Sequence, residues 1–289
     1  MILGIASGVI GCLAYWKRQN LMSDALSHAA LPGVVVVFLL TGEKHLFYLV
    51  IGAGISALIG AYFIQWVTTS SRISEDSAMG MVLSVFYGLG IMLLTIANRL
   101  EGGNQSGLDR FIYGQAAAMV RSDVITMIIL ASIVILVVIV GFKEWKIYLF
   151  DPQLAKGLGL SVKGMNSLYT AVLVITIVVG IQAVGVILMA AMLIIPAVSS
   201  RYWTQSFKTM LVLAAVFGGL SGAGGTFIST LRRGLPTGSL IVVVAAGFFV
   251  VSLLFGKERG LIIKYFHFKS HQKAQTKSLE PLDGEVPGK

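Results

Sequence analysis

An acidic side chain and an imidazole lie four residues apart in a segment that is otherwise mostly apolar. On a helix, Asp24 and His28 would point to the same face, within reach of one ion. A carboxylate oxygen and an imidazole nitrogen suit Mn²⁺, Fe²⁺ or Zn²⁺. The alternative is that Ser23 or Asp24 caps the helix and His28 is a packed histidine. An ionisable group in a membrane segment costs about 2.5–3.5 kcal/mol by insertion scales, which makes such groups candidates for function.

The same segment continues into Pro32 and Gly33. Proline removes a hydrogen-bond donor from a helix, and glycine lowers helix stability. We therefore expect the helix to loosen here, where backbone groups could face a pore.

A second pattern lies in the longest loop between apolar segments. Its residues are Asp151, Pro152, Gln153, Leu154, Ala155, Lys156, Gly157, Leu158 and Gly159. The first two are typical of an N-cap and a first helical position, and the final glycine is typical of a residue that ends a helix. We expect a short helix outside the membrane. Leu154, Ala155 and Leu158 would form an apolar face, covered either by another protein or by the chain's own bundle.

Two adjacent acidic residues, Glu75 and Asp76, precede the apolar segment that starts at Ser77. They could bind a metal ion in transit, and they are therefore candidate additional ligands. The alternative, which we favour, is that they cap the helix that begins at Ser77, because acidic groups stabilise a helix N-terminus.

Five other residues could in principle bind metal. His267 and His271 are four apart in a polar tail, Glu43 and His45 lie in a short loop, and Cys12 lies in an apolar segment. We expect the first four to be solvated and Cys12 to pack against its neighbours. A single cysteine excludes a disulfide within the chain and a thiolate metal cluster.

The composition indicates a membrane protein. Of 289 residues, 56% are hydrophobic and 12% are charged, against roughly 25% charged in a soluble domain. Residues 164–200 contain no charged side chain or histidine. As one helix this stretch would be about 55 Å long, well beyond the roughly 30 Å hydrocarbon core. It must fold back, and Gly180, Gly185 and Pro196 are the expected break points.

We expect an all-α, polytopic membrane protein with about eight or nine transmembrane helices. The first apolar segment would span only about 24 Å, which is short for a full crossing. Several segments are rich in glycine and alanine, which predicts close helix packing. The nine apolar segments are 2–16, 25–41, 46–67, 77–97, 123–142, 166–183, 185–203, 209–229 and 236–256.

The basic residues predict the orientation. Most of the 22 Lys and Arg residues fall in alternate loops and in the tail, which the positive-inside rule places in the cytoplasm. Orientation and anionic lipid thus explain the net charge of +9, and no nucleic-acid partner is expected. Residues 257–289 are polar, and we expect a disordered cytoplasmic tail. The cytoplasmic segments are 17–24, 68–76, 143–165, 201–208 and 257–289.

Five blocks of the chain, in order, resemble the permease subunits of manganese, zinc and iron ABC importers. The first runs from Ser23 through Asp24 and His28 to Gly33. The others are 75–80, 150–155, 184–197 and 235–238. One block alone has low specificity, whereas five in the right order are highly specific. The resemblance covers nearly the whole apolar region, and the short N-terminus is the departure from the family pattern.

The resemblance implies a permease fold related to the cobalamin and siderophore type, over residues 1–256. It implies that Asp24 and His28 handle the transported ion and that residues 151–159 form a coupling helix seated in a groove of the ATPase. The implied partners are two ATP-binding subunits, an extracytoplasmic metal-binding protein, a second permease copy, identical or similar, and lipid. No permanently bound cofactor is expected, and the implied location is the bacterial cytoplasmic membrane.

Three other functions fit less well. A gradient-driven secondary metal transporter needs ionisable residues in several spans, and an intramembrane metalloenzyme needs a fuller ligand set such as His-Glu-x-x-His. A cobalamin or siderophore permease would not need Asp24 and His28. No phosphate-binding G-x-x-x-x-G-K-[ST] motif occurs, so ATP hydrolysis is expected in a separate subunit. Oxygen and nitrogen ligands fit Mn²⁺, Zn²⁺ and Fe²⁺ alike, and the absence of thiols favours Mn²⁺.

Overall fold

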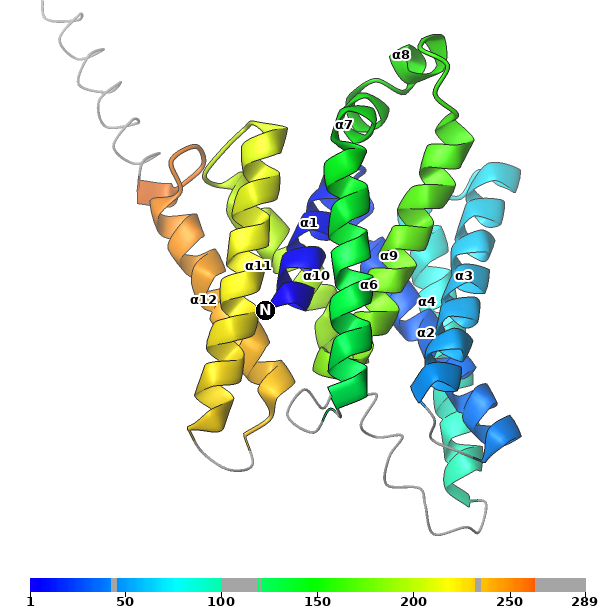
Figure 1. The fold of residues 1–289 in the computed structure, drawn as a ribbon. Coiled ribbons are helices and arrows are strands. Elements are labelled where there is room, and N and C mark those ends of the chain that lie inside the picture. The colour runs from blue at the N-terminus through cyan, green and yellow to red at the C-terminus, as the bar shows by residue number, and fades with distance from the viewer. Residues whose placement is uncertain (43–45, 100–118, 120, 232–234, 263–289) are drawn as a thin grey trace, which may run out of the picture.

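The computed structural model describes residues 1–42, 46–99, 119, 121–231 and 235–262. In this part the chain forms helices joined by turns, with no strand (Figure 1). The helices are α1 (Ile2–Trp16), α2 (Asn20–Thr41), α3 (Leu46–Ser70), α4 (Glu75–Arg99), α6 (Arg121–Val140), α7 (Phe142–Phe150), α8 (Pro152–Gly157), α9 (Val162–Val184), α10 (Val186–Arg201), α11 (Phe207–Thr230) and α12 (Thr237–Phe255).

Each of the nine apolar segments forms a helix, which confirms the all-α prediction. Among the described residues, seven helices are long and apolar enough to cross a membrane. The other two, α1 and α10, have 15 and 16 residues. Helices of this length span about 24 Å, less than the roughly 30 Å hydrocarbon core.

Helix α1 lies in the interior of the bundle, against α10 and α11 (Figure 1). Small residues allow the backbone of α1 to approach its neighbours closely. A Cβ atom added to Gly4 would lie 2.1 Å from the carbonyl oxygen of Gly218, and one added to Gly8 would lie 2.2 Å from that of Ala214. The backbones of α1 and α11 therefore touch, as the glycine-rich sequence predicts.

Helices α2, α3 and α4 form a second tightly packed group. A Cβ atom on Gly33 would lie 2.0 Å from the carbonyl oxygen of Gly52, and Ser56 Oγ donates a hydrogen bond to the Ala29 carbonyl at 2.6 Å. The expectation that α2 loosens at Pro32 is wrong, because the helix runs unbroken from Asn20 to Thr41. Close packing on α3 holds the backbone where proline removes a bond.

The charge-free stretch folds back at one of the three expected positions. Gly185 has φ 95 and separates α9 from α10, a conformation that glycine adopts without strain. Gly180 and Pro196 do not break the chain, because they lie inside α9 and α10. A Cβ atom on Gly180 would lie 2.1 Å from Met189 Sδ, so this glycine serves close packing between the two helices.

The described parts of the segments predicted to be cytoplasmic gather at one end of the bundle, the end that carries α7 and α8 (Figure 1). The prediction that residues 143–150 lie in a loop is wrong, because they belong to the helix α7, which begins after Gly141. Trp145 anchors it, with its side chain fully buried. Which side of the membrane this end faces remains a prediction from the distribution of basic residues.

Candidate metal site and partner-binding helix

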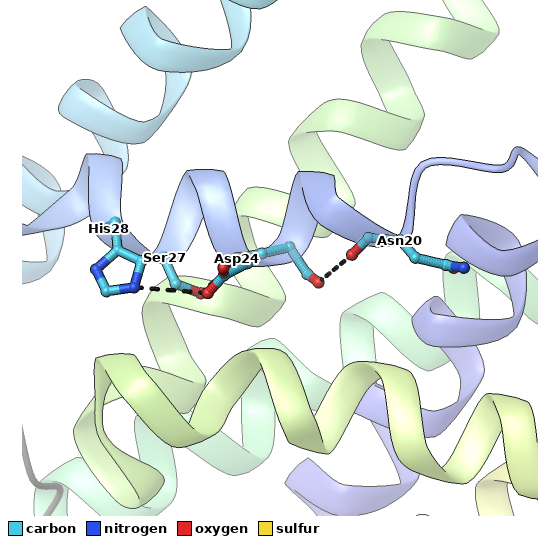
Figure 2. A network of polar contacts seen from close by, with 5 residues as sticks. Asn20, Asp24, Ser27 and His28 are labelled. Atoms are coloured by element: carbon cyan, nitrogen blue, oxygen red, sulfur yellow. Dashed lines mark hydrogen bonds and ion pairs between the residues drawn. The ribbon is translucent and has the colours of Figure 1, made fainter. Parts of the chain in front are cut away.

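The structure brings Asp24 and His28 together on one face of α2. His28 Nε2 lies 3.5 Å from Asp24 Oδ1 (Figure 2). The His28 side chain is 15% exposed and the Asp24 side chain is 34% exposed, so the pair reaches the surface of this chain. The predicted shared face is confirmed, whereas the role of the pair in metal handling remains a prediction.

The alternative that Ser23 or Asp24 caps this helix is wrong. Helix α2 begins at Asn20, so both residues lie inside it. Ser23 Oγ donates to the Asn20 carbonyl at 2.9 Å, and Ser27 Oγ donates to the Ser23 carbonyl at 2.7 Å. Both serine hydroxyls are hydrogen-bonded within the helix, and Asp24 remains available to an external ligand (Figure 2).

His28 keeps one ring nitrogen without a partner. Its imidazole contacts the edge of Tyr87 on α4, with ring centroids 4.9 Å apart. Nδ1 is buried and makes no hydrogen bond with the described residues. The other ring nitrogen, Nε2, faces Asp24 and is the atom placed to share an ion with that carboxylate.

One chain alone does not complete a metal site in the described residues. No group of three or more His, Cys, Asp or Glu side chains converges there. Asp24 and His28 supply one oxygen and one nitrogen, which is half of a four-ligand set. His267 and His271, and also Glu43 and His45, which we expect to be solvated, lie outside the described residues.

Glu75 and Asp76 occupy the first turn of α4, rather than a cap before Ser77. The capping residue is Ser74, whose Oγ accepts a hydrogen bond from the Ser77 backbone N–H at 3.3 Å. Both carboxylates still complement the positive helix N-terminus. Glu75 Oε2 also accepts a hydrogen bond from Gln19 Nε2 at 2.9 Å, which ties α4 to the turn before α2.

Helix α8 is bounded as predicted. The Asp151 side chain accepts hydrogen bonds from the backbone N–H groups of Gln153 at 3.1 Å and Leu154 at 2.9 Å. At the other end Gly159 has φ 82, and the N–H of Leu160 bonds to the Ala155 carbonyl at 2.9 Å. This is the hydrogen-bond pattern of a Schellman motif.

The apolar face of α8 is divided between the bundle and the surface. Ala155 is fully buried, whereas Leu154 and Leu158 are 51% and 60% exposed. These two leucines lie one helical turn apart, and the side chain of Phe150, just before the helix, is also exposed. Within the described residues the bundle covers only the inner side of α8.

A half-buried lysine lies near the start of α2, where no pattern in the sequence indicates it. The Lys17 ammonium donates a hydrogen bond to Asn166 Oδ1 on α9 and lies 4.1 Å from the ring centroid of Tyr169. Tyr148 on α7 donates to the same Asn166 oxygen at 3.2 Å. We call Lys17, Tyr148, Asn166 and Tyr169 the lysine cluster. Its members come from three separate segments, so no local sequence pattern indicates it.

Burial has a large effect on this cluster. Burial lowers the pKa of Lys17 to about 8, and the Glu75 carboxylate opposes that shift. Burial also raises the pKa of Tyr148 to about 12, with Glu75 as the second cause. The Tyr148 hydroxyl is therefore protonated at neutral pH and is available as a donor to Asn166.

Comparison with known proteins agrees with the resemblance noted in the sequence. Residues 1–256 match the family model described as the ABC 3 transport family. The manganese transport system membrane protein MntC of Bacillus subtilis is 45% identical over 264 residues, which are 91% of this chain and 61% of that protein. The zinc transport system membrane protein TroC of Treponema pallidum is 42% identical over 91% of this chain and 88% of its own length.

A solved structure has the same fold. PsaBC from Streptococcus pneumoniae in complex with Fab superposes with a TM-score of 0.79 at 32% identity, covering 93% of this chain and 91% of that chain. The apolar helices and the membrane-transport relatives place the protein in the bacterial plasma membrane. The chain therefore belongs to the ABC 3 transport family and is a multi-pass membrane protein.

Proposed function

We propose that this chain is the permease subunit of an ATP-driven importer that translocates divalent transition-metal ions into the cytoplasm. The observation that carries this proposal is the Asp24–His28 pair on α2, with Asp24 Oδ1 and His28 Nε2 3.5 Å apart on one face of the helix. The family, and relatives named for manganese and zinc transport, support it.

The pair acts as half of a shared site. Two copies of the chain, or this chain and a similar permease, bring two Asp24 and two His28 side chains, or their equivalents, to a common axis. This gives two oxygens and two nitrogens, which replace part of the ion's hydration shell and yet release the ion. Thiolates would hold it more tightly, and the single cysteine, Cys12, is buried away from this face.

Manganese is the favoured substrate, with zinc and iron as alternatives. Carboxylate oxygens are hard ligands that suit Mn²⁺, and imidazole accommodates all three ions. MntC of Bacillus subtilis and TroC of Treponema pallidum are named for manganese and zinc, respectively. Competition among the three ions in an uptake assay decides between them.

ATP hydrolysis belongs to a separate pair of subunits that bind α8. The exposed Leu154 and Leu158 insert into a groove of each ATPase, and the capped ends make α8 a rigid lever. Movement of α8 passes to α7, and from Tyr148 through Asn166 to Lys17, three residues before α2. The lysine cluster thus connects ATPase closure to the helix that carries Asp24, which switches between outward and inward states.

An extracytoplasmic binding protein delivers the metal to the opposite end. We place its docking surface on residues 99–123, most of which lie outside the described residues. We retain this partner because the chain's Asp24–His28 pair supplies too few ligands to capture a dilute ion without help.

Metal uptake by the reconstituted complex tests the proposal. Asp24→Asn and His28→Gln, singly and together, should abolish uptake of radioactive Mn²⁺ into proteoliposomes containing the permease, its ATPase and the loaded binding protein. The control variant Asp76→Asn removes an acidic group from α4 at the same end of the bundle and should retain uptake.

The same assay separates the rival mechanisms. Uptake should require ATP and stop with vanadate, because ATP hydrolysis by a separate subunit drives it. Uptake that persists without ATP and responds to a proton or sodium gradient would identify a secondary transporter. Normal uptake by the double variant would remove Asp24 and His28 from the mechanism.

A further inference from the structure

A large cavity opens at the end of the bundle that carries α7 and α8, apart from the Asp24–His28 pair. Its volume is about 560 Å³, within the range of roughly 300–1,000 Å³ that is usual for small-molecule sites. Three arginines and three aromatic residues contribute to its wall. The lining residues are Tyr15, Trp16, Arg18, Asn20, Leu149, Phe150, Arg201 and Arg259.

One of the arginines is held in place by the protein. The Arg201 guanidinium lies 5.1 Å from the ring of Trp16, and its Nη1 donates to the Thr204 carbonyl at 2.8 Å. Trp16 is itself fixed by Phe150, with ring centroids 4.6 Å apart. A guanidinium has five N–H donors, so most of those on Arg201 remain available to a ligand.

The other two arginines add positive charge without a matching acid. Arg18 lies in the turn between α1 and α2, and Arg259 follows α12. Neither they nor Arg201 forms an ion pair with a carboxylate of the described residues, and none of the eight lining residues is acidic. Arginines commonly follow helix ends because they complement the helix dipole. That effect explains each one separately, but not the convergence of all three on one cavity.

Arg18 lies just after the C-terminal end of α1. It has φ 60, the left-handed conformation, and among the described residues it is the one non-glycine residue with positive φ. Its N–H donates to the Tyr15 carbonyl at 3.1 Å and the Gln19 N–H donates to the Ala14 carbonyl at 3.0 Å, so this conformation belongs to a Schellman motif that ends the helix. The turn directs the chain from α1 into α2 beside the cavity.

The lining of the cavity indicates the ligand. Tyr15 and Trp16, at the end of α1, add two aromatic rings to the cavity wall. Leu149 and Phe150 add an apolar wall beside the arginines. A ligand with a phosphate group and an attached hydrocarbon matches both parts, and basic pockets at the cytoplasmic ends of helices bind anionic headgroups.

We propose that this cavity binds the phosphate headgroup of an anionic phospholipid, with Arg18, Arg201 and Arg259 as its cationic ligands. The lipid headgroup and the free phosphate ion both present charged phosphate oxygens. Arginine recognises this group through paired hydrogen bonds. The lipid is favoured over free phosphate because the aromatic and aliphatic wall would contact its glycerol backbone and the first part of its acyl chains.

Native mass spectrometry of the full chain tests the proposal. The protein is exchanged into mixed micelles that contain phosphatidylglycerol or phosphatidylcholine with the same acyl chains, and retained lipid is counted. The wild type should retain phosphatidylglycerol selectively. The variant Arg18→Gln/Arg201→Gln/Arg259→Gln should retain at least about tenfold less phosphatidylglycerol than the wild type. Each basic residue near an anionic surface contributes a severalfold change in binding.

A matched control separates a site from general charge attraction. Lys143→Gln/Lys146→Gln/Lys208→Gln removes the same charge at the same end but outside the cavity, and it should retain phosphatidylglycerol as the wild type does. If the triple arginine variant is not monodisperse, the exposed pair Arg18→Gln/Arg259→Gln replaces it. Equal loss in the cavity variant and the control variant would overturn the proposal, as would unchanged retention in the cavity variant.

Inorganic phosphate provides the arm that distinguishes the source. Millimolar phosphate should leave the retained phosphatidylglycerol in place, because it lacks the apolar contacts. Displacement of the lipid by phosphate, or selective loss of ATPase binding in the cavity variant with lipid retention intact, would show another occupant and overturn the proposal.

Discussion

At the scale of residues, two charged groups near the start of α2 have opposite surroundings. Asp24 is 34% exposed and reaches the chain's surface beside His28. Lys17, seven residues earlier, is enclosed by the rings of Tyr148 and Tyr169 and donates to Asn166. The first arrangement is available to an external ion, and the second fixes the turn before α2 to α7 and α9.

The surroundings of Lys17 predict an unusual titration. Its pKa is lowered to about 8 by burial, and Glu75 opposes the shift. The protonation of Lys17 should therefore be half complete near pH 8, and Glu75→Gln should lower this midpoint further because it removes the opposing carboxylate. Competitive acylation followed by mass spectrometry of the Lys17 peptide measures both midpoints. A higher midpoint in Glu75→Gln would contradict the assignment.

The same pKa shift makes the free energy of unfolding depend on pH. Between about pH 8 and the ordinary lysine value the unfolded chain binds more protons at this site than the folded chain. The contribution of Lys17 to the free energy of unfolding therefore rises with pH across that window. Below pH 8 both states are protonated, and the folded protein carries the full cost of the buried charge.

The sequence predicted the Asp24–His28 pair but not the lysine cluster, for a physical reason. A spacing of four residues places two side chains together within a single helix, whatever surrounds it. Lys17 is more than a hundred residues from Tyr148 and Asn166 along the chain, so the cluster forms only when separate segments pack together. Their types and spacing therefore carry no signal that could be read along the chain.

At the scale of elements, α8 combines fixed ends with an uncovered side. Its boundaries were predictable because Asp151 and Gly159 act on neighbouring backbone groups. The apolar segments were likewise predictable, since composition alone decides which stretches enter lipid. The behaviour of Pro196 was not, because a helix with an internal proline persists or breaks according to its neighbours.

The exposed side of α8 should determine ATPase binding. Leu154→Asp and Leu158→Asp each place a charge where an apolar contact is proposed, and each should reduce co-purification of the ATPase subunit by about tenfold or more. Leu261→Asp, at another exposed leucine, is the control and should retain binding. Thermal unfolding of the permease should be unchanged, because both α8 leucines project from the bundle. Normal co-purification of both α8 variants would exclude α8 as the coupling helix.

At the scale of the whole molecule, burial is concentrated around α1, α2 and α9, while α4, α6 and α12 present mostly uncovered apolar side chains. An apolar exterior is expected where lipid is the solvent. The face of α2 that carries Asp24 and His28 differs from that exterior because it is polar. A polar face within the membrane requires a partner, and a second permease copy provides one.

Cysteine cross-linking tests this arrangement. Leu21 lies on the same face of α2 as Asp24 and is 48% exposed. Leu21→Cys should form a covalent dimer with a short bis-maleimide reagent. Ile139→Cys should not, although Ile139 is 62% exposed and lies on α6 near the same end of the bundle. The natural Cys12 is buried and does not interfere. Equal cross-linking at both positions would contradict a dimer formed through α2.

The direct contact between Gly4 and Gly218 has a consequence for biosynthesis. Helix α1 packs in the interior of the bundle, and its partner α11 leaves the ribosome about 200 residues later. At roughly 5–20 residues per second, translation of that interval takes on the order of ten to forty seconds. During this time α1 must wait at the insertion machinery or under temporary cover, and it enters its final position only when the last third of the polypeptide arrives.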